Sequence, residues 1–245
     1  MHKHIITLFI LCINSSLLFG QKNAVDIAWN PNSYLKKKHT IQYCVDNNSY
    51  KIKHLKVESE ADYELFLKHA KYLKHIDSLS ICSIGSICKL INELETEDLK
   101  IMGDLPDLPN LTFLSINKPA LTHLATNLND FKKLKYLDIG ASFKAIPEAI
   151  WELKQLEKLH LYGYFTSVSE KVLSLENLNS LSLQGEYKTL PLPTAPKTKL
   201  TSLKLSGFFS TTPEFLDYCP NIRFLEIMSD EPMHIGDNIG KVPKV

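Results

Sequence analysis

The chain carries almost no net charge, which bears on the partners that it can hold. Its 28 Lys and Arg residues are balanced by 27 Asp and Glu residues, for a net charge of +1. Proteins that grip nucleic acid by its phosphates need a clear basic excess on one face. The short run at residues 36–38, three lysines, is typical of a solvated surface. We therefore expect no nucleic-acid partner.

Motifs for catalysis and metal binding are missing as well. The nine histidines form no His-Glu-x-x-His pair, and the chain has neither a Gly-x-Ser-x-Gly turn nor a glycine-rich phosphate loop. His69 and His75 are six residues apart, a spacing that does not place two ligands on one helix face. The sequence thus predicts no catalytic residue, no cofactor and no metal site, and a protein that is not an enzyme.

Cysteine is scarce, with five residues in the chain. Outside the N-terminal apolar run, Cys44, Cys82, Cys88 and Cys219 form no Cys-x-x-Cys metal pair and match no disulfide-dense scaffold. Cys219 takes the repeat position that leucine holds at Leu153, which predicts a buried free thiol. Whether Cys82 and Cys88 form a disulfide is left open.

One apolar run stands out, at residues 5–19. It is shorter than the roughly 20 residues of a membrane-spanning helix. Lys3 precedes the run and Gly20 follows it, as in a secretory signal peptide cleaved before Gln21. We expect residues 1–20 to be removed and the mature protein to be secreted, periplasmic or on the cell surface, with no membrane span. The alternatives are an uncleaved anchor and a cytoplasmic protein.

The strongest positive feature is a constant leucine period. Leu137, Leu159, Leu181, Leu203 and Leu225 fall 22 residues apart, each inside a Leu-x-x-Leu-x-Leu frame in which isoleucine replaces some leucines. Apolar frame positions alternate with polar ones, as in a strand with one buried face. A fixed period of this length indicates stacked repeats that share one core. With less regular copies upstream, we expect strands centred near Leu55, Leu79, Leu99, Leu114, Leu137, Leu159, Leu181, Leu203 and Leu225.

The frame resembles that of the leucine-rich repeat family, Leu-x-x-Leu-x-Leu-x-x-Asn-x-Leu. The resemblance covers residues 52–245 and implies an α/β solenoid, right-handed, with a curved parallel sheet on the concave face and short helices or extended returns on the convex face. In that family the Asn hydrogen-bonds neighbouring turns, but no repeat here has Asn at that position. We expect an N-terminal cap at residues 21–51 and about nine repeats in residues 52–245, with the last strand open or continued in a longer chain.

Local patterns predict further elements. Residues 40–45 alternate like a strand, and Ser59 begins a helix with a capping box. That helix has its apolar face at Tyr63, Phe66, Leu67, Ala70 and Leu73. Residues 86–94, 146–153 and 168–175 have helical spacing, whereas the prolines of residues 190–199 favour an extended path.

Two residue types recur just after the strands. Glycine stands two residues past the last frame position, where we expect it to permit a positive φ, at Gly103, Gly163, Gly185 and Gly207. Aromatic residues stand two positions later and predict a buried ladder of Phe143, Phe165, Tyr187 and Phe209.

The frame positions that point away from the core define the expected binding face. They are Lys56, Ser80, Lys100, Ser115, Asp138, His160, Ser182, Lys204 and Glu226, which we expect to be exposed on the concave face. The residues expected to contact a partner are Tyr136, Asp138, Lys158, His160, Tyr162, Lys204 and Glu226. Together with the family resemblance, this face predicts an exported, non-catalytic recognition module that binds a protein or a glycan. The alternative is a scaffold or targeting array of a longer polypeptide, with its effector or catalytic domain beyond residue 245.

Overall fold

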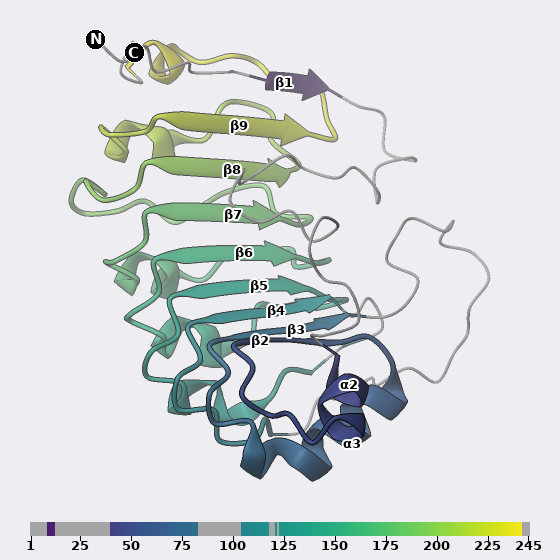
Figure 1. The fold of residues 1–245 in the computed structure, drawn as a ribbon. Helices are drawn as coiled ribbons and strands as arrows, with labels where there is room; N and C mark the ends of the chain where they lie inside the picture. The colour runs from purple at the N-terminus through teal and green to yellow at the C-terminus, as the bar shows by residue number, and fades with distance from the viewer. Residues whose placement is uncertain (1–8, 13–39, 83–103, 118–120, 122, 242–245) are drawn as a thin grey trace, which may run out of the picture.

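The described part of the chain forms one parallel sheet. The structure is a computed structural model that describes residues 9–12, 40–82, 104–117, 121 and 123–241. Nine strands stack in the order β1-β9-β8-β7-β6-β5-β4-β3-β2 (Figure 1). The strands are β1 (Phe9–Cys12), β2 (His54–Val57), β3 (Ser78–Cys82), β4 (Phe113–Asn117), β5 (Tyr136–Gly140), β6 (Lys158–Tyr162), β7 (Ser180–Gln184), β8 (Ser202–Gly207) and β9 (Phe224–Ser229).

The leucine period sets the register of this sheet. Each frame leucine pairs with the frame leucine of the next strand, as Leu137 does with Leu159 and Leu159 with Leu181. All eight described frame leucines are buried, so the expected core ladder is confirmed. The expected strand at Leu99 is different. Leu99 lies outside the described residues, but β3 pairs directly with β4, so no strand lies between them and the proposed intermediate position in the stack was wrong.

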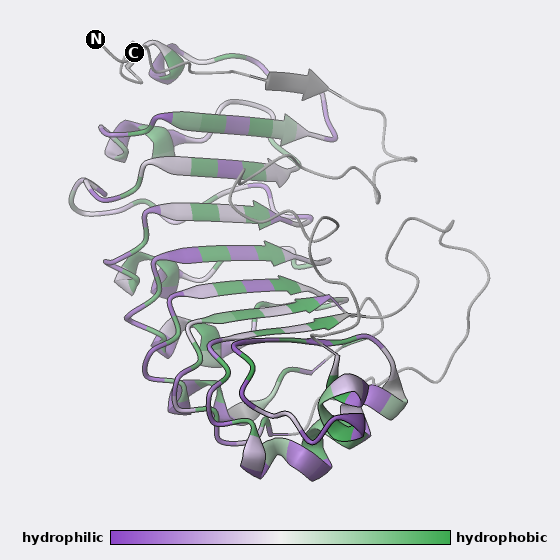
Figure 2. Cartoon of the chain, viewed as in Figure 1, coloured by the Kyte–Doolittle hydropathy of each residue, from purple (hydrophilic) through white to green (hydrophobic). Residues whose placement is uncertain are grey.

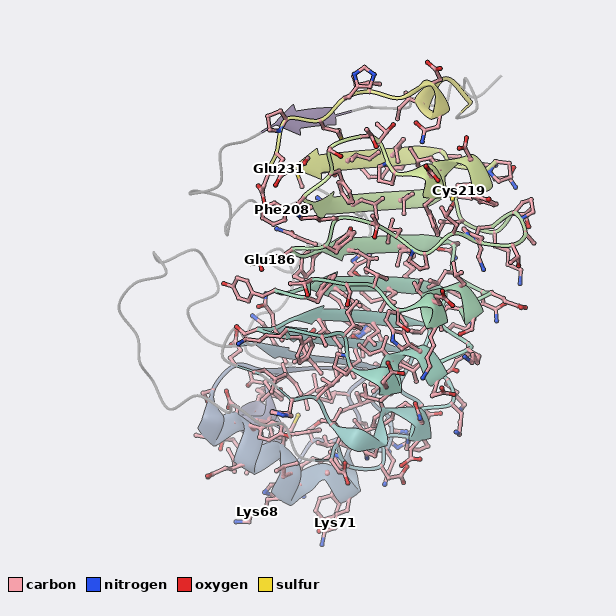
Figure 3. The ribbon with its side chains drawn as sticks, turned by 180° about the vertical axis from the view of Figure 1, so that it is seen from behind. Lys68, Lys71, Glu186, Phe208, Cys219 and Glu231 are labelled. Carbon is pink, nitrogen blue, oxygen red and sulfur yellow. The ribbon has the colours of Figure 1, made fainter. Side chains whose placement is uncertain are left out.

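Alternation along each strand gives the sheet one apolar and one polar face. Figure 2 shows green residues alternating with purple or pale ones along the strands from β5 to β8. Leucine and isoleucine point toward the returning segments and form a continuous core with them. The view from behind in Figure 3 shows these returns, including the one that carries Cys219.

The two described returns expected to be helical, 146–153 and 168–175, contain short 3-10 helices rather than α-helices, η3 (Glu148–Glu152) and η4 (Glu170–Ser174). The sequence did not predict three further 3-10 helices, η2 (Thr126–Asp130), η5 (Glu214–Tyr218) and η6 (Asp237–Lys241). Pro147 and Pro213 precede two of them with φ at −59°, the angle that the proline ring imposes. A repeat of 22 residues leaves few residues for the return, and 3-10 turns are used in such short pieces. Residues 190–199 contain no helix, as their prolines predicted.

The N-terminal cap is helical, which corrects one expectation. Residues 41–46 form the α-helix α2 (Ile41–Asp46), not a strand. Thr40 caps it through its side-chain oxygen, which accepts a hydrogen bond from the Tyr43 amide at 3.2 Å. Ile41 and Cys44 are both fully buried, three residues apart on one helix face. The alternation in the sequence was therefore part of a helical pattern.

The helix expected to begin at Ser59 was predicted correctly except at one residue. Helix α3 (Glu60–His69) begins after Ser59, whose hydroxyl accepts from the Asp62 amide at 3.1 Å, and continues into the 3-10 turn η1 (Ala70–Tyr72). Tyr63, Phe66, Ala70 and Leu73 are buried as expected, but Leu67 is 44% exposed and lies outside the apolar face.

The aromatic ladder is confirmed, while the glycine expectation was wrong. Phe165 and Tyr187 stack with ring centroids 5.6 Å apart, and Tyr187 meets Phe209 edge-on at 5.4 Å. No described glycine has a positive φ. Instead, a Cβ on Gly185 would come within 2.7 Å of the Phe165 ring. Glycine is needed because the chain passes directly over the ladder, not because of an unusual backbone angle.

The edge of the sheet at β9 bears on two expectations, the signal segment at residues 1–20 and the open last strand. The backbone of β1, inside the predicted signal segment, pairs in parallel with β9, from Phe9 opposite Glu226 to Cys12 opposite Ser229. The outer edge of β9 is thus covered in this structure. The predicted helix at 86–94, Gly103 and the Cys82–Cys88 question lie outside what the structure describes. Among the described helices, none has the length and apolar character needed to cross a membrane.

Candidate functional site

The polar face of the sheet presents one residue per strand in register. We call this set the sheet-face row; it consists of Lys56, Ser80, Ser115, Asp138, His160, Ser182, Lys204 and Glu226 on β2 to β9. Neighbouring strands are about 4.8 Å apart, so each side chain of the row lies beside those of the adjacent strands. Lys100, which we expected in the row, lies outside the described residues.

The row is more buried than the sequence suggested. Ser80, His160, Ser182 and Lys204 are all less than a tenth exposed, so the expectation that they would be solvated was wrong. The alternation of apolar and polar residues predicts which face of the sheet a side chain points to. It does not predict how exposed that side chain is to solvent. On this face a short serine lies below the longer side chains of adjacent strands.

An aromatic cluster spans β4, β5 and β6. The Phe113 and Tyr136 rings stack with centroids 4.5 Å apart and planes tilted by 20°. The Tyr136 hydroxyl lies 3.1 Å from Nδ1 of His160, and their rings meet edge-on. The Lys158 ammonium is 5.9 Å from the centre of the Tyr136 ring. Three of the predicted contact residues, Tyr136, Lys158 and His160, are therefore brought into one cluster.

Asp138 lies beside this cluster with an altered proton affinity. Burial raises the pKa of Asp138 to about 6, while the hydrogen bond from the Ser115 hydroxyl, 3.0 Å long, opposes the rise. Tyr162 follows on β6, and burial together with the charges of Asp138 and Glu226 raises the pKa of its phenol, whereas the nearby Ser182 hydroxyl lowers it. Tyr162 therefore stays protonated and able to donate a hydrogen bond at neutral pH.

The other predicted contact residues form a buried ion pair on β8 and β9. Lys204 Nζ lies 3.0 Å from Glu226 Oε1, with side chains 5% and 15% exposed. The ammonium is well placed for attraction but makes no well-directed hydrogen bond, and the Ser182 hydroxyl beside it on β7 makes none either. The predicted residues thus form two groups, joined by Ser182, which the sequence placed in the row but not among the contact residues.

The row aligns Asp138, His160 and Ser182 on consecutive strands, the residue types of a hydrolase triad. The hydrogen bonds do not follow that order. His160 Nδ1 faces the Tyr136 hydroxyl, and Asp138 accepts from Ser115. The described residues also contain no cluster of three or more side chains suited to a metal ion. What this arrangement offers a ligand is hydrogen bonding and aromatic contact.

A second ladder replaces the missing family asparagine. It lies four residues before each frame leucine and consists of Asn110, Lys133, Gln155, Asn177, Lys199 and Asn221. Each amide side chain donates to a backbone carbonyl of the preceding turn, as Asn177 does to Lys154 at 2.9 Å and Asn221 to Thr198 at 2.7 Å. The turn carbonyls are thus satisfied from a different position. The 22-residue register could have revealed this ladder from the sequence.

The ladder borders an open polar groove at the start of strands β5 to β8. Its volume is about 590 Å³, and it is lined by Lys135, Gln155, Glu157, Asn177, Asn179 and Lys199. Lys135 and Glu157 form an exposed ion pair at 2.6 Å, and Lys199 donates to the Asn177 side chain at 2.7 Å. Four of the six lining side chains therefore pair with one another, and Gln155 donates to the Phe131 carbonyl, so the groove serves the turns of the repeats.

Cys44 and Cys219, the two cysteines whose side chains the structure describes, are free and buried, as expected for Cys219. Burial raises the pKa of the Cys219 thiol to about 12 although Lys197 lowers it, and Sγ lies 3.4 Å from the Phe215 carbonyl. This thiol stays protonated and belongs to the core rather than to a reactive site.

Comparison with known proteins shows the fold. No protein-family model and no curated protein matches the sequence. Among solved structures, an internalin (InlF) from Listeria monocytogenes matches with a TM-score of 0.52 and 16% identity, over 80% of this chain and 54% of that one. The chain thus spans about half the length of the internalin. A leucine-rich repeat protein from Leptospira interrogans matches with a TM-score of 0.46 and 17% identity, over 83% and 61% of the two chains. Together with the leucine register, the internalin match shows that this chain has the leucine-rich repeat fold.

Proposed function

We propose that this leucine-rich repeat chain is an exported, non-catalytic recognition module. It binds a protein or glycan partner through the sheet-face row and the aromatic residues beside it. The observation that carries this proposal is the cluster of Phe113, Tyr136, Lys158 and His160 across three adjacent strands. The similarity to the internalin supports the repeat fold, whereas the choice of face is argued from the residues.

The composition of this face favours recognition. Contact surfaces are enriched in aromatic residues, and the residues that dominate binding energy cluster in desolvated positions. Tyr136 supplies a large rigid ring, held by Phe113 on one side and by the imidazole of His160 on the other. Such a ring loses little conformational freedom when a partner covers it, so more of the contact energy remains for binding.

The tyrosines provide the test of the proposed face. A partner isolated with the chain that begins at Gln21 should bind the Tyr136→Ala and Tyr162→Ala variants more weakly by more than about 1 kcal/mol each. The exposed return residues Lys171 and Glu176 serve as matched controls, and their alanine variants should bind as the parent does. Calorimetric titration gives the affinities, and thermal melts check that each variant is folded. If the return variants lose binding and the tyrosine variants keep it, the array binds through its other face and acts as a scaffold.

A further inference from the structure

The centre of the sheet-face row contains polar groups that the protein leaves without hydrogen bonds. Ser182 and Lys204 pair in register on β7 and β8, and each is 4% exposed. Lys204 Nζ makes no well-directed hydrogen bond, although Glu226 provides a charge at 3.0 Å from the ammonium. Ser182 Oγ makes none either, although it lies close enough to the Tyr162 phenol to lower the pKa of that phenol. A lysine ammonium has three donors. Buried donors without acceptors are unfavourable, so their presence in the row points to a ligand that supplies the acceptors.

The charges around these two residues limit the kind of ligand. Lys204 lies next to Glu226, and Asp138 lies two strands away from Ser182 in the same row. An anionic ligand would place its charge among these carboxylates, because the Lys204 ammonium is already paired with Glu226 and the Lys158 ammonium lies over the Tyr136 ring. A cationic ligand would have to approach the ammonium itself. A neutral ligand whose groups both donate and accept hydrogen bonds avoids both problems.

Hydroxyl groups have this dual character. One hydroxyl can accept from Lys204 while donating to Glu226, and its neighbour can pair with Ser182. The phenol of Tyr162, close to Ser182, is a further donor or acceptor for the same ligand. Adjacent hydroxyls on a small rigid ring are the arrangement found in sugars.

Aromatic rings beside the row, two residues earlier on their strands, extend the site. Tyr136, stacked on Phe113 at 4.5 Å, lies on β5, two strands from Ser182. At about 4.8 Å per strand, the distance from β5 to β8 is comparable with a few linked sugar rings. The apolar face of a pyranose packs on aromatic rings, so a chain of sugars running across the strands would meet Tyr136 at one end and Lys204 at the other.

We propose that the sheet-face row binds a neutral oligosaccharide laid across strands β5 to β8, with Ser182 and the Lys204–Glu226 pair hydrogen-bonding adjacent sugar hydroxyls. This inference rests on the proposed recognition function and selects a glycan rather than a protein as the partner.

Two variants and one control test the site in the full chain. Ser182→Ala removes the hydroxyl, and the double variant Lys204→Met with Glu226→Gln removes both charges, so that no carboxylate is left without its cation. Ser80→Ala is the matched control, since Ser80 lies in the same row on β3, outside strands β5 to β8, and is 8% exposed. The probes are cello-, manno-, malto-, laminari- and chito-hexaose, with heparin and polyglutamate as anionic comparators, each titrated by calorimetry.

We expect saturable binding of at least one neutral hexasaccharide. Neither heparin nor polyglutamate should bind more tightly than that hexasaccharide. Ser182→Ala should weaken that binding about fivefold and the double variant at least about tenfold, as loss of hydrogen bonds to a ligand predicts. Ser80→Ala should bind as the parent does. The melting temperature of Ser182→Ala should fall no further than that of Ser80→Ala, because the Ser182 hydroxyl makes no well-directed hydrogen bond and has only the Tyr162 phenol close by. If Ser182 instead stabilised the fold, its loss would lower the melting temperature further.

Three results overturn the inference. They are failure of every neutral hexasaccharide at millimolar concentration, stronger binding of heparin or polyglutamate, and equal affinities for the Ser182 and Ser80 variants. If the sugars fail but Tyr136→Ala weakens a protein partner, the recognition function stands and only the ligand class was wrong. If substitutions on the return segments abolish binding of that partner, the proposal that the chain binds through its sheet face is wrong.

Discussion

At the scale of single residues, position within the repeat decides which side chains support the fold. Leu159 is fully buried in the leucine ladder, and His160, next to it on the other face, is 7% exposed. The sequence alone suggested that His160 would be solvated and that its loss would change stability by less than about 0.5 kcal/mol. Its burial and its contacts with Tyr136 change that expectation.

We predict that both substitutions destabilise the protein, to different extents. Leu159→Ala should lower the free energy of unfolding by about 2–5 kcal/mol because it leaves a cavity in the core. His160→Ala should cost about 1–2 kcal/mol through the lost hydrogen bond and ring contact. Glu176→Ala, at an exposed position, should stay within about 0.5 kcal/mol. Denaturant melts compare the three, and a His160 variant as stable as the Glu176 variant would show that His160 is solvated.

Asp138 predicts a specific pH dependence. Its pKa is raised to about 6 from 3.8, so the folded state holds this proton more tightly than the unfolded state. The resulting stability is present below about pH 4 and is lost as pH rises to about 6. Asp138→Asn cannot ionise and should therefore gain stability relative to the parent across that window. Parallel denaturant melts at pH 4, 5, 6 and 7 measure the difference, and a difference that stays constant with pH would contradict the raised pKa.

At the scale of elements, the ladders hold the repeats together where the family asparagine is missing. Amide side chains of the second ladder donate to turn carbonyls before β4, β6, β7 and β9, and the aromatic ladder fills the space after the strands. Tyr187 links the aromatic ladder to the backbone, since its hydroxyl donates to the Leu183 carbonyl at 3.0 Å. Glycine then follows from packing, because the chain crosses directly above the rings.

We predict that Gly185→Ala destabilises the array by about 1–3 kcal/mol, as overpacking of a filled core does. The added methyl group would lie 2.7–2.9 Å from three atoms of the Phe165 ring, closer than such atoms approach. Gly240→Ala is the control, since no atom lies within 4 Å of the methyl position there. Thermal melts of the two variants give the comparison, and equal melting temperatures would mean that the ladder can shift to admit the methyl group.

At the scale of the whole molecule, the sequence predicted what repeats and missed what depends on neighbours. The register, the core leucines and the aromatic ladder follow from a constant period, which any single repeat can be checked against. The cap has no second copy, and the alternation of residues 40–45 concealed that Ile41 and Cys44 lie three residues apart on a helix. Burial of Ser182 and Lys204 also escaped prediction, because it arises from side chains on adjacent strands.

The stack of strands ends at β9, whose outer edge is paired with β1, and export with cleavage of the signal segment would change this edge. Stability in such arrays is close to a sum over nearest neighbours, so the last strand depends on the one beside it. Here β1 covers β9 through four paired residues, from Phe9 with Glu226 to Cys12 with Ser229. Cleavage before Gln21, as the signal segment predicts, would remove β1 and leave the backbone groups of that edge without their partners.

We therefore predict that the chain beginning at Gln21 exchanges backbone amide hydrogens faster in β9 than the full chain does. The strands β5 to β7 should exchange alike in both, because each keeps two neighbouring strands. Hydrogen–deuterium exchange followed by mass spectrometry of peptides covering residues 224–229 measures the effect, and N-terminal sequencing of protein from its source shows which form exists. Exchange in β9 that does not change on truncation would mean that β1 contributes nothing to this edge. Recovery of the intact Met1 end in a soluble cytosolic fraction would instead overturn export, and β1 would then belong to the working protein.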